Sequence, residues 1–208
     1  MTLWPPYIEW DLTATGLLPA DWEAQVHSTI HTDAIHTVLS GTSEQSREMD
    51  GNYELPILVV SGEACNVRMP WLRGLYEKEL REFASQGYGH PLFVARDVRS
   101  SINVNCLRGV GARYEAHVDT NTVTGVLFVS NVTELTGGEL VFAHPDKPNA
   151  TVLPKAGVFI AFDARTIPHF VAPLKTAMDR ISIPMNYYDH PDVQYRPAGL
   201  DERLYTVR

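Results

Sequence analysis

The sequence predicts an α+β protein that is mainly β, with N-terminal helices supporting a closed β architecture. Two observations predict this fold class. The first third of the chain carries apolar residues at helical spacing, and from residue 91 short runs with a period of two follow one another between turn signals. Many short, evenly spaced strands favour a sandwich or barrel. Helices that precede the strands favour a helical layer against one face of it.

The length and composition predict one domain that spans residues 1–208. The chain has 208 residues, of which 44% are hydrophobic and 20% charged, a balance typical of a globular protein with a sizeable core. The changes of pattern divide the chain into a helical support region (1–90), a β region (91–190) and a C-terminal tail (191–208).

The net charge and the cysteine content indicate which partners and which cellular compartment to expect. A net charge of −8 gives no general attraction to a phosphate backbone, so nucleic acid is not an expected partner. Cys65 and Cys106 do not make a disulfide framework, and the N-terminus lacks the basic and apolar parts of a secretory signal. No apolar run is long enough to span a membrane. We therefore expect a cytoplasmic protein without a membrane partner.

Two helices and one strand are predicted in the support region. Residues 20–39 form the first helix, with Asp21 at its start, and residues 70–85 form the second, with Gly87 as its C-terminal cap. The run 55–60 predicts a strand between them, and Pro56 favours an edge position because proline cannot donate to a sheet. The apolar stripe of the first helix comprises Trp22, Val26, Ile30, Ala34 and Val38.

Nine strands are predicted beyond residue 90, bounded by glycine- and proline-bearing turns. Their ranges are 91–98, 101–108, 112–118, 123–130, 138–143, 151–153, 157–163, 169–173 and 179–188.

A histidine and a carboxylate, His117 and Asp119, are two residues apart in the third of these runs. Residues i and i+2 of a strand point to the same face, so an imidazole nitrogen and a carboxylate oxygen could hold one metal ion there. His169, at the start of a later strand, supplies a third ligand. Two histidines and one carboxylate on one face of a metal are typical of non-haem Fe(II) oxygenases.

An arginine and a serine, Arg180 and Ser182, share one face of the last predicted strand. An arginine in an apolar strand requires an anionic partner, and a guanidinium binds a carboxylate through two parallel hydrogen bonds. The distal carboxylate of 2-oxoglutarate would satisfy it, and the Ser182 hydroxyl could add a third bond. The alternative is a salt bridge with Asp179 or Glu139.

The stretch 102–188 resembles the 2-oxoglutarate- and Fe(II)-dependent dioxygenases, most closely their prolyl-hydroxylase branch. The matching segments are "GARYEAHVD", "GGELVF", "GVFIAFDARTIPHFVAP" and "RISIPMNYY". The resemblance implies a double-stranded β-helix (a jelly-roll, cupin-like barrel), with Fe(II), 2-oxoglutarate and O2 as cofactor and cosubstrates. It also implies that His117, Asp119 and His169 are the catalytic iron ligands and that Arg180 and Ser182 bind the cosubstrate.

The sequence departs from that branch where the cosubstrate and the substrate would bind. Nine residues before His117, where prolyl hydroxylases often carry a cosubstrate-binding tyrosine, stands Arg108, so either Arg108 or Asn105 is expected in that role. Asn186 replaces a tryptophan, which disfavours proline as the substrate. Tyr114 and Arg113 precede the ligand pair and are further candidates for substrate contact. The polar segment 40–54 is a candidate lid.

The predicted reaction is hydroxylation of an unactivated C–H bond of a small molecule, with release of succinate and CO2. An amino acid or a metabolite derived from one is the preferred substrate class, because a minimal barrel leaves little room for a peptide-docking domain. One alternative is a protein prolyl or side-chain hydroxylase, and another is a cupin-like barrel that binds metal without catalysis. A homodimer is neither required nor excluded.

Overall fold

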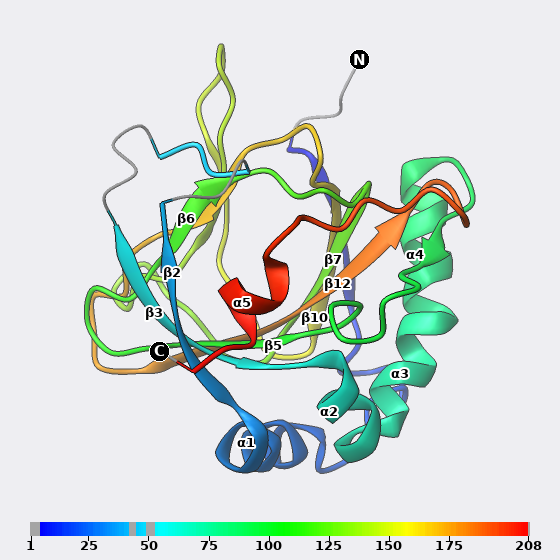
Figure 1. Ribbon diagram of the computed structural model, residues 1–208, viewed down its shortest axis with the longest axis horizontal. Helices are drawn as coiled ribbons and strands as arrows, with labels where there is room; N and C mark the ends of the chain where they lie inside the picture. The colour runs from blue at the N-terminus through cyan, green and yellow to red at the C-terminus, as the bar shows by residue number, and fades with distance from the viewer. Residues whose placement is uncertain (1–4, 42–44, 49–52, 208) are drawn as a thin grey trace.

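The computed structural model describes residues 5–41, 45–48 and 53–207, and it contains two antiparallel β-sheets that face each other (Figure 1). The larger sheet has eight strands in the order β1-β10-β7-β12-β5-β3-β2, with β4 paired to β12, and the smaller has the order β6-β11-β8-β9. The larger sheet comprises β1 (Tyr7–Asp11), β2 (Ile35–Ser40), β3 (Glu54–Val60), β4 (Phe93–Val94), β5 (Val104–Arg108), β7 (Val123–Phe128), β10 (Val158–Asp163) and β12 (Asp179–Tyr188). The smaller comprises β6 (Tyr114–His117), β8 (Leu140–Phe142), β9 (Ala150–Val152) and β11 (His169–Val171).

Four helices cover the outer face of the larger sheet, at the bottom and right of Figure 1: α1 (Trp22–Asp33), α2 (Gly62–Arg68), α3 (Pro70–Glu77) and α4 (Glu79–Tyr88). The strands of this sheet alternate between two apolar layers. Val104 and Cys106 of β5 pack with the helices, whereas Leu107 packs with residues of the smaller sheet. The predicted mainly-β fold with supporting helices is confirmed.

The first predicted helix, 20–39, is a helix followed by a strand in the structure. α1 ends at Asp33, and residues Ile35–Ser40 form β2, which pairs with β3. The i, i+4 stripe continued through Val38 by coincidence, because a β-branched run such as "IHTV" also suits a strand. The support region is therefore not purely helical, since it also contributes β1, β2 and β3 to the larger sheet.

The second predicted helix, 70–85, is two helices that meet at Lys78. The φ and ψ angles of Lys78 are −121° and −91°, so α3 stops at Glu77 and α4 restarts at Glu79. The C-terminal cap is Gly89, with a left-handed φ of 83°, and not Gly87. Gly87 instead lies against Ile8 of β1, where a Cβ atom would come within 2.2 Å of that side chain.

The strand around Pro56 is not the edge of the sheet. β2 takes that position, and β3 lies between β2 and β5. However, β3 pairs with β5 only over Leu58–Val60, so Pro56 lies in the half of β3 that has β2 as its paired neighbour. The missing N–H of the proline therefore interrupts no pairing with β5, although the predicted edge position is wrong.

Each of the nine predicted β ranges overlaps a strand, which is shorter than predicted in most cases. The range 91–98 keeps only the two residues of β4. Of the candidate lid, residues 42–44 and 49–52 lie outside the described residues, and Ser46 forms an isolated bridge with His117. No helix in the described ranges is long and apolar enough to cross a membrane.

The C-terminal tail carries a short helix, α5 (Leu200–Leu204), at the centre of Figure 1. Its backbone is held to the larger sheet, where the Thr37 hydroxyl donates to the Arg203 carbonyl oxygen at 3.0 Å. Tyr205 follows it, is buried, and lies 2.6 Å from the Asn103 carboxamide oxygen. The tail therefore belongs to the wall of the barrel.

Candidate active site

A cavity of about 180 Å³ lies between the two sheets and holds the residues that the sequence singled out for chemistry. His117, Asp119 and His169 line it from the smaller sheet, and Arg180 and Ser182 line it from β12 of the larger sheet. The cavity thus brings together side chains from three segments that are distant in the sequence.

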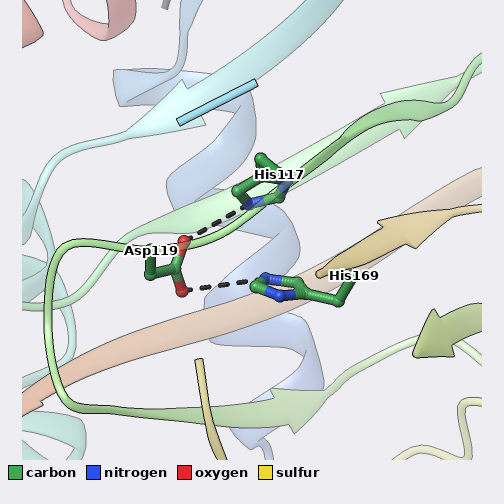
Figure 2. A group of neighbouring side chains, drawn as sticks. All are labelled: His117, Asp119 and His169. Carbon is green, nitrogen blue, oxygen red and sulfur yellow. Dashed lines mark ion pairs between the residues drawn. The ribbon is translucent and has the colours of Figure 1, made fainter. Parts of the chain in front are cut away.

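The three predicted iron ligands converge on one point (Figure 2). β6 and β11 are antiparallel neighbours, and their register sets His169 opposite His117. Asp119 follows the end of β6, with its two carboxylate oxygens 3.3 Å from His117 Nε2 and 3.7 Å from His169 Nε2. All three ligand atoms lie within 4.8 Å of one another, which is close enough to share one metal ion.

Backbone carbonyl groups orient both histidine rings. His117 Nδ1 lies 2.7 Å from the Glu115 carbonyl oxygen, and His169 Nδ1 lies 3.0 Å from that of Ile167. A carbonyl can only accept, so each Nδ1 carries the proton and donates it. Each Nε2 then presents its lone pair towards Asp119, as a metal ligand requires.

The electrostatics of the group favour a charged carboxylate beside a neutral His169, whereas for His117 burial is outweighed by the hydrogen bond and charge of Asp119, which raise the pKa of the ring. Burial alone would raise the pKa of Asp119, but the neighbouring His169 and His117 hold it below its usual range. Burial and His117 lower the pKa of His169 to about 4. One anionic oxygen and a neutral imidazole nitrogen at neutral pH are the donor states that divalent iron binds.

Thr124 of β7 fixes the orientation of the carboxylate. Its hydroxyl donates to Asp119 Oδ2 at 2.5 Å. The sequence analysis did not single out Thr124, because nothing in the local pattern links it to the ligand pair. Asn121 also bonds to the Thr124 hydroxyl, which ties the turn after β6 to the larger sheet.

Arg180 is buried in the cavity without an acidic partner among the described residues. Its side chain donates to the Gly138 carbonyl oxygen at 2.7 Å and to the Ser182 hydroxyl at 3.1 Å. Burial lowers its pKa from 12.5 to about 10. Both alternative partners from the sequence are otherwise engaged, since Asp179 pairs with Arg108 and Glu139 lies 4.0 Å from Lys175. The guanidinium is therefore available to an anion in the cavity.

The expected role of Arg108 in cosubstrate binding is wrong. Its side chain is 58% exposed and pairs with Asp179 at 2.7 Å and 2.8 Å on the helix-covered side of the sheet. Alternation along β5 explains this, because Asn105 and Leu107 face the cavity and Arg108 faces the other way. Asn105 therefore remains the candidate of the two, and it lies opposite Ser182 in the sheet register.

Of the three predicted substrate residues, Tyr114 and Asn186 line the cavity and Arg113 does not. The Tyr114 ring centroid lies 5.0 Å from that of His117. Arg113 instead forms an ion pair with Glu48 at 2.5 Å and lies over the ring of Tyr53. Its neighbours in β6 take the inward positions, so its selection as a substrate residue is corrected.

The C-terminal segment contributes residues that sequence analysis missed. Arg203 lines the cavity and forms an ion pair with Glu115, which is fully buried in β6. Pro197, Leu200 and Leu204 lie beside it. A sequence separation of 88 residues between Glu115 and Arg203 leaves no local pattern that could have revealed the pair.

The comparisons with known proteins agree with this site. Residues 102–188 match the family model of the 2OG-Fe(II) oxygenase superfamily, and this range contains all five residues of the ligand triad and the Arg180–Ser182 pair. The matched stretch is thus similar to the 2-oxoglutarate- and Fe(II)-dependent oxygenases. The triad of His117, Asp119 and His169 is a donor set that fits the Fe(II) of that superfamily. No curated protein sequence matches it.

Solved structures share the fold at low sequence identity. An oxidoreductase of the 2OG-Fe(II) oxygenase family from Burkholderia pseudomallei is 15% identical with a TM-score of 0.68, over 93% of this chain and 90% of that one. The epimerase SnoN, solved with Fe3+, alpha ketoglutarate and nogalamycin RO, is 16% identical with a TM-score of 0.67, over 95% and 84%. A Pseudomonas putida prolyl-4-hydroxylase is 19% identical with a TM-score of 0.55, over 89% and 93%. The fold is thus the jelly-roll of these oxygenases.

Proposed function

We propose that the protein hydroxylates an unactivated C–H bond of a small molecule, an amino acid or a metabolite derived from one. In this proposal His117, Asp119 and His169 hold the iron. When bound, iron and 2-oxoglutarate together supply the activation of O2, and the cosubstrate leaves as succinate and CO2. The residues of the chain bind and orient the reactants and exclude water.

The observation that carries the proposal is the buried, unpaired charge of Arg180. A guanidinium in an apolar interior is costly unless an anion neutralises it. It faces the same cavity as the ligand triad, so a dianion could bind the metal at one end and Arg180 at the other. Ser182 bonds to Arg180 and Asn105 lies opposite Ser182 in the sheet register, so both could add hydrogen bonds to the distal carboxylate.

The size of the cavity and its cover support a small substrate. The volume of about 180 Å³ has to hold the metal, the cosubstrate and the reacting part of the substrate. Residues of α5 occupy part of its wall, where an extended peptide would need an open groove. Tyr114 and Asn186 are the proposed substrate contacts among the residues that the sequence singled out.

A protein hydroxylase is the second candidate. One solved structure with this fold is a prolyl hydroxylase from Trichoplax adhaerens in complex with a hypoxia inducible factor peptide fragment, with 16% identity and a TM-score of 0.61. A prolyl peptide that stimulates succinate formation more than free amino acids do would favour this candidate.

The test is an anaerobic titration of metal-free protein with Fe(II) and then with 2-oxoglutarate, followed by visible absorption. We expect a charge-transfer band that requires both components. We further expect Arg180→Ala to bind iron and to need far more 2-oxoglutarate for the band. A band of equal strength and affinity in Arg180→Ala would contradict the role of Arg180, and iron binding without any band would contradict the proposal.

A further inference from the structure

The cavity is also lined by polar side chains that neither the ligand triad nor the proposed cosubstrate site uses. They are Arg203 of α5, Asn121 of the turn after β6 and Asn186 of β12. Together they offer a cationic donor and two carboxamides.

Arg203 is held in place from three sides. The fully buried Glu115 accepts from its Nη2 atom, and the Thr37 hydroxyl fixes its backbone oxygen. Tyr205, two residues on, is buried against the Arg99 carbonyl oxygen at 3.0 Å. The Nε atom of Arg203 and the Oε2 atom of Glu115 are both buried without a hydrogen-bond partner among the described residues, so the two side chains are paired through Nη2 alone. Arg203 also lines the cavity, and a guanidinium that a buried carboxylate fixes at a cavity wall fits a second carboxylate there.

The carboxamides of Asn186 and Asn121 offer acceptors. Asn186 donates its amide to the Ser100 carbonyl oxygen at 2.8 Å, and Asn121 donates its amide to the Val123 carbonyl oxygen at 2.9 Å. Because a carbonyl accepts only, the amide orientation of each asparagine is determined, and each Oδ1 is left as an acceptor. In the sheet register Asn186 lies opposite Thr124, the residue that bonds to Asp119. The acceptors therefore lie near the metal ligands.

The charges of the site favour a substrate with no net charge. The charged side chains among the described cavity residues, apart from the histidines, are Asp119, Arg180 and Arg203. With iron and the 2-oxoglutarate dianion in place, Asp119 and Arg180 are neutralised, and Glu115 neutralises Arg203 from behind. A substrate that brings both a carboxylate and an ammonium group leaves this balance unchanged.

We infer that Arg203 binds the carboxylate of a zwitterionic amino-acid substrate while the Oδ1 atoms of Asn186 and Asn121 accept from its ammonium group. Glu115 is the positioning residue for Arg203, and Leu200 and Leu204 of α5 cover the side chain of the substrate. This inference rests on the proposed function and deepens it, because it assigns the amino-acid substrate to a subsite formed by the C-terminal helix.

The first experiment uses the iron-loaded enzyme with 2-oxoglutarate and measures succinate formation. The probes are the twenty proteinogenic L-amino acids, each supplied singly, and then the methyl ester and the N-acetyl derivative of the best one. We expect at least one free amino acid to stimulate turnover and both derivatives to lose most of that stimulation. An ester as active as the free acid, or no stimulation by any amino acid, would overturn the inference.

The second experiment tests the residues. Arg203→Gln is expected to raise KM for that amino acid on the order of tenfold to a hundredfold, as loss of a charge-assisted hydrogen bond does, and to change kcat less. Arg203→Lys should restore part of the loss, and Glu115→Gln should raise KM by weakening the position of the guanidinium. The matched control is Arg68→Gln, which breaks the ion pair between Arg68 of α2 and Asp33 of α1, away from the cavity, and should leave KM unchanged. Equal KM values for Arg203→Gln and the control would refute the subsite.

The charge-transfer band of Fe(II) and 2-oxoglutarate distinguishes a failure of the proposed function from a failure of the substrate subsite. The variants at Arg203 and Glu115 should keep the band, because neither residue touches the metal or the cosubstrate in the proposed site. A wild-type protein without the band would refute the proposed function itself. A wild-type protein with the band but without turnover of any amino acid would refute the substrate class alone.

Discussion

Replacing Arg180 with methionine should make the ligand-free protein more stable while it removes the affinity for 2-oxoglutarate. Methionine fills a similar volume and adds no charge. The pKa of Arg180 falls from 12.5 to about 10 because the guanidinium is desolvated. At about 1.4 kcal/mol for each pKa unit, burial of this charge costs the folded state about 3 kcal/mol.

The two hydrogen bonds of Arg180 offset part of this cost. The Gly138 carbonyl oxygen and the Ser182 hydroxyl would lose their donor in the variant. Losing the two hydrogen bonds costs about 0.5–1.5 kcal/mol each, or about 1–3 kcal/mol together, since water in the cavity can replace the lost donor. We therefore expect Arg180→Met to raise the free energy of unfolding of the metal-free protein by up to about 2 kcal/mol.

The assay is urea unfolding of each protein, first without ligands and then with Mn(II) and 2-oxoglutarate. The wild-type protein should gain about 2.7 kcal/mol when 2-oxoglutarate is present at a hundred times its dissociation constant. The variant should gain nothing from 2-oxoglutarate beyond the effect of the metal. A variant that is destabilised without ligands and is still stabilised by 2-oxoglutarate would refute the view that Arg180 is held for the cosubstrate.

Three further predictions follow from other contacts. Thr124→Val removes only the hydroxyl that bonds to Asp119, and we expect the affinity for Mn(II) to fall about 10- to 100-fold in a metal titration; unchanged affinity would exclude an orienting role. Gly138→Ala should lower the free energy of unfolding by roughly 1–2 kcal/mol and weaken 2-oxoglutarate binding, because φ is +89° and the new Cβ would lie 3.3 Å from Arg180 Cδ; binding equal to wild type would contradict this. Burial raises the pKa of Asp97, but hydrogen bonds from Ser100 and Arg196 lower it by more, so its net pKa lies below 3.8. The stability that Asp97 contributes is therefore present above pH 3.8 and is lost as the pH falls through the folded-state pKa. Hydrogen exchange of residues 191–207 should therefore rise at low pH before that of β10, and equal protection of both segments would argue against Asp97 as an anchor of the tail.

The succession of strands along the chain and the candidate ligand set could be predicted because the relevant signals are local. Each strand is a short run with period two, and the close spacing of His117 and Asp119 marked them as a pair, although β6 ends at His117 and Asp119 lies in the segment that follows. Arg180 could be assigned because a charge in an apolar strand indicates a partner. These signals can be read from the sequence without knowledge of the fold.

The wrong predictions concern residues whose structure or orientation depends on contacts with segments distant in the sequence. Residues 35–40 continue a helical stripe, yet the neighbouring β3 turns them into a strand. Arg108 and Arg113 are polar residues near the site, but strand alternation points the first to the opposite side and Glu48 holds the second outside. Arg203 reaches the cavity through a pair with Glu115 that no local pattern records.

The lengths of the strands have a consequence for the order in which the protein unfolds. β8, β9 and β11 have three residues each and β6 has four, whereas β12 of the larger sheet has ten. Local stability in a protein follows buried contacts and hydrogen bonds, so the smaller sheet should open first in the metal-free protein. His117 lies on β6 and His169 on β11, which pair with each other in the smaller sheet. One metal ion bound to both histidines would therefore link two strands that are distant in the sequence. Binding of the metal and closing of the smaller sheet are then coupled, and the metal that serves the chemistry also sets how long that half of the barrel stays closed.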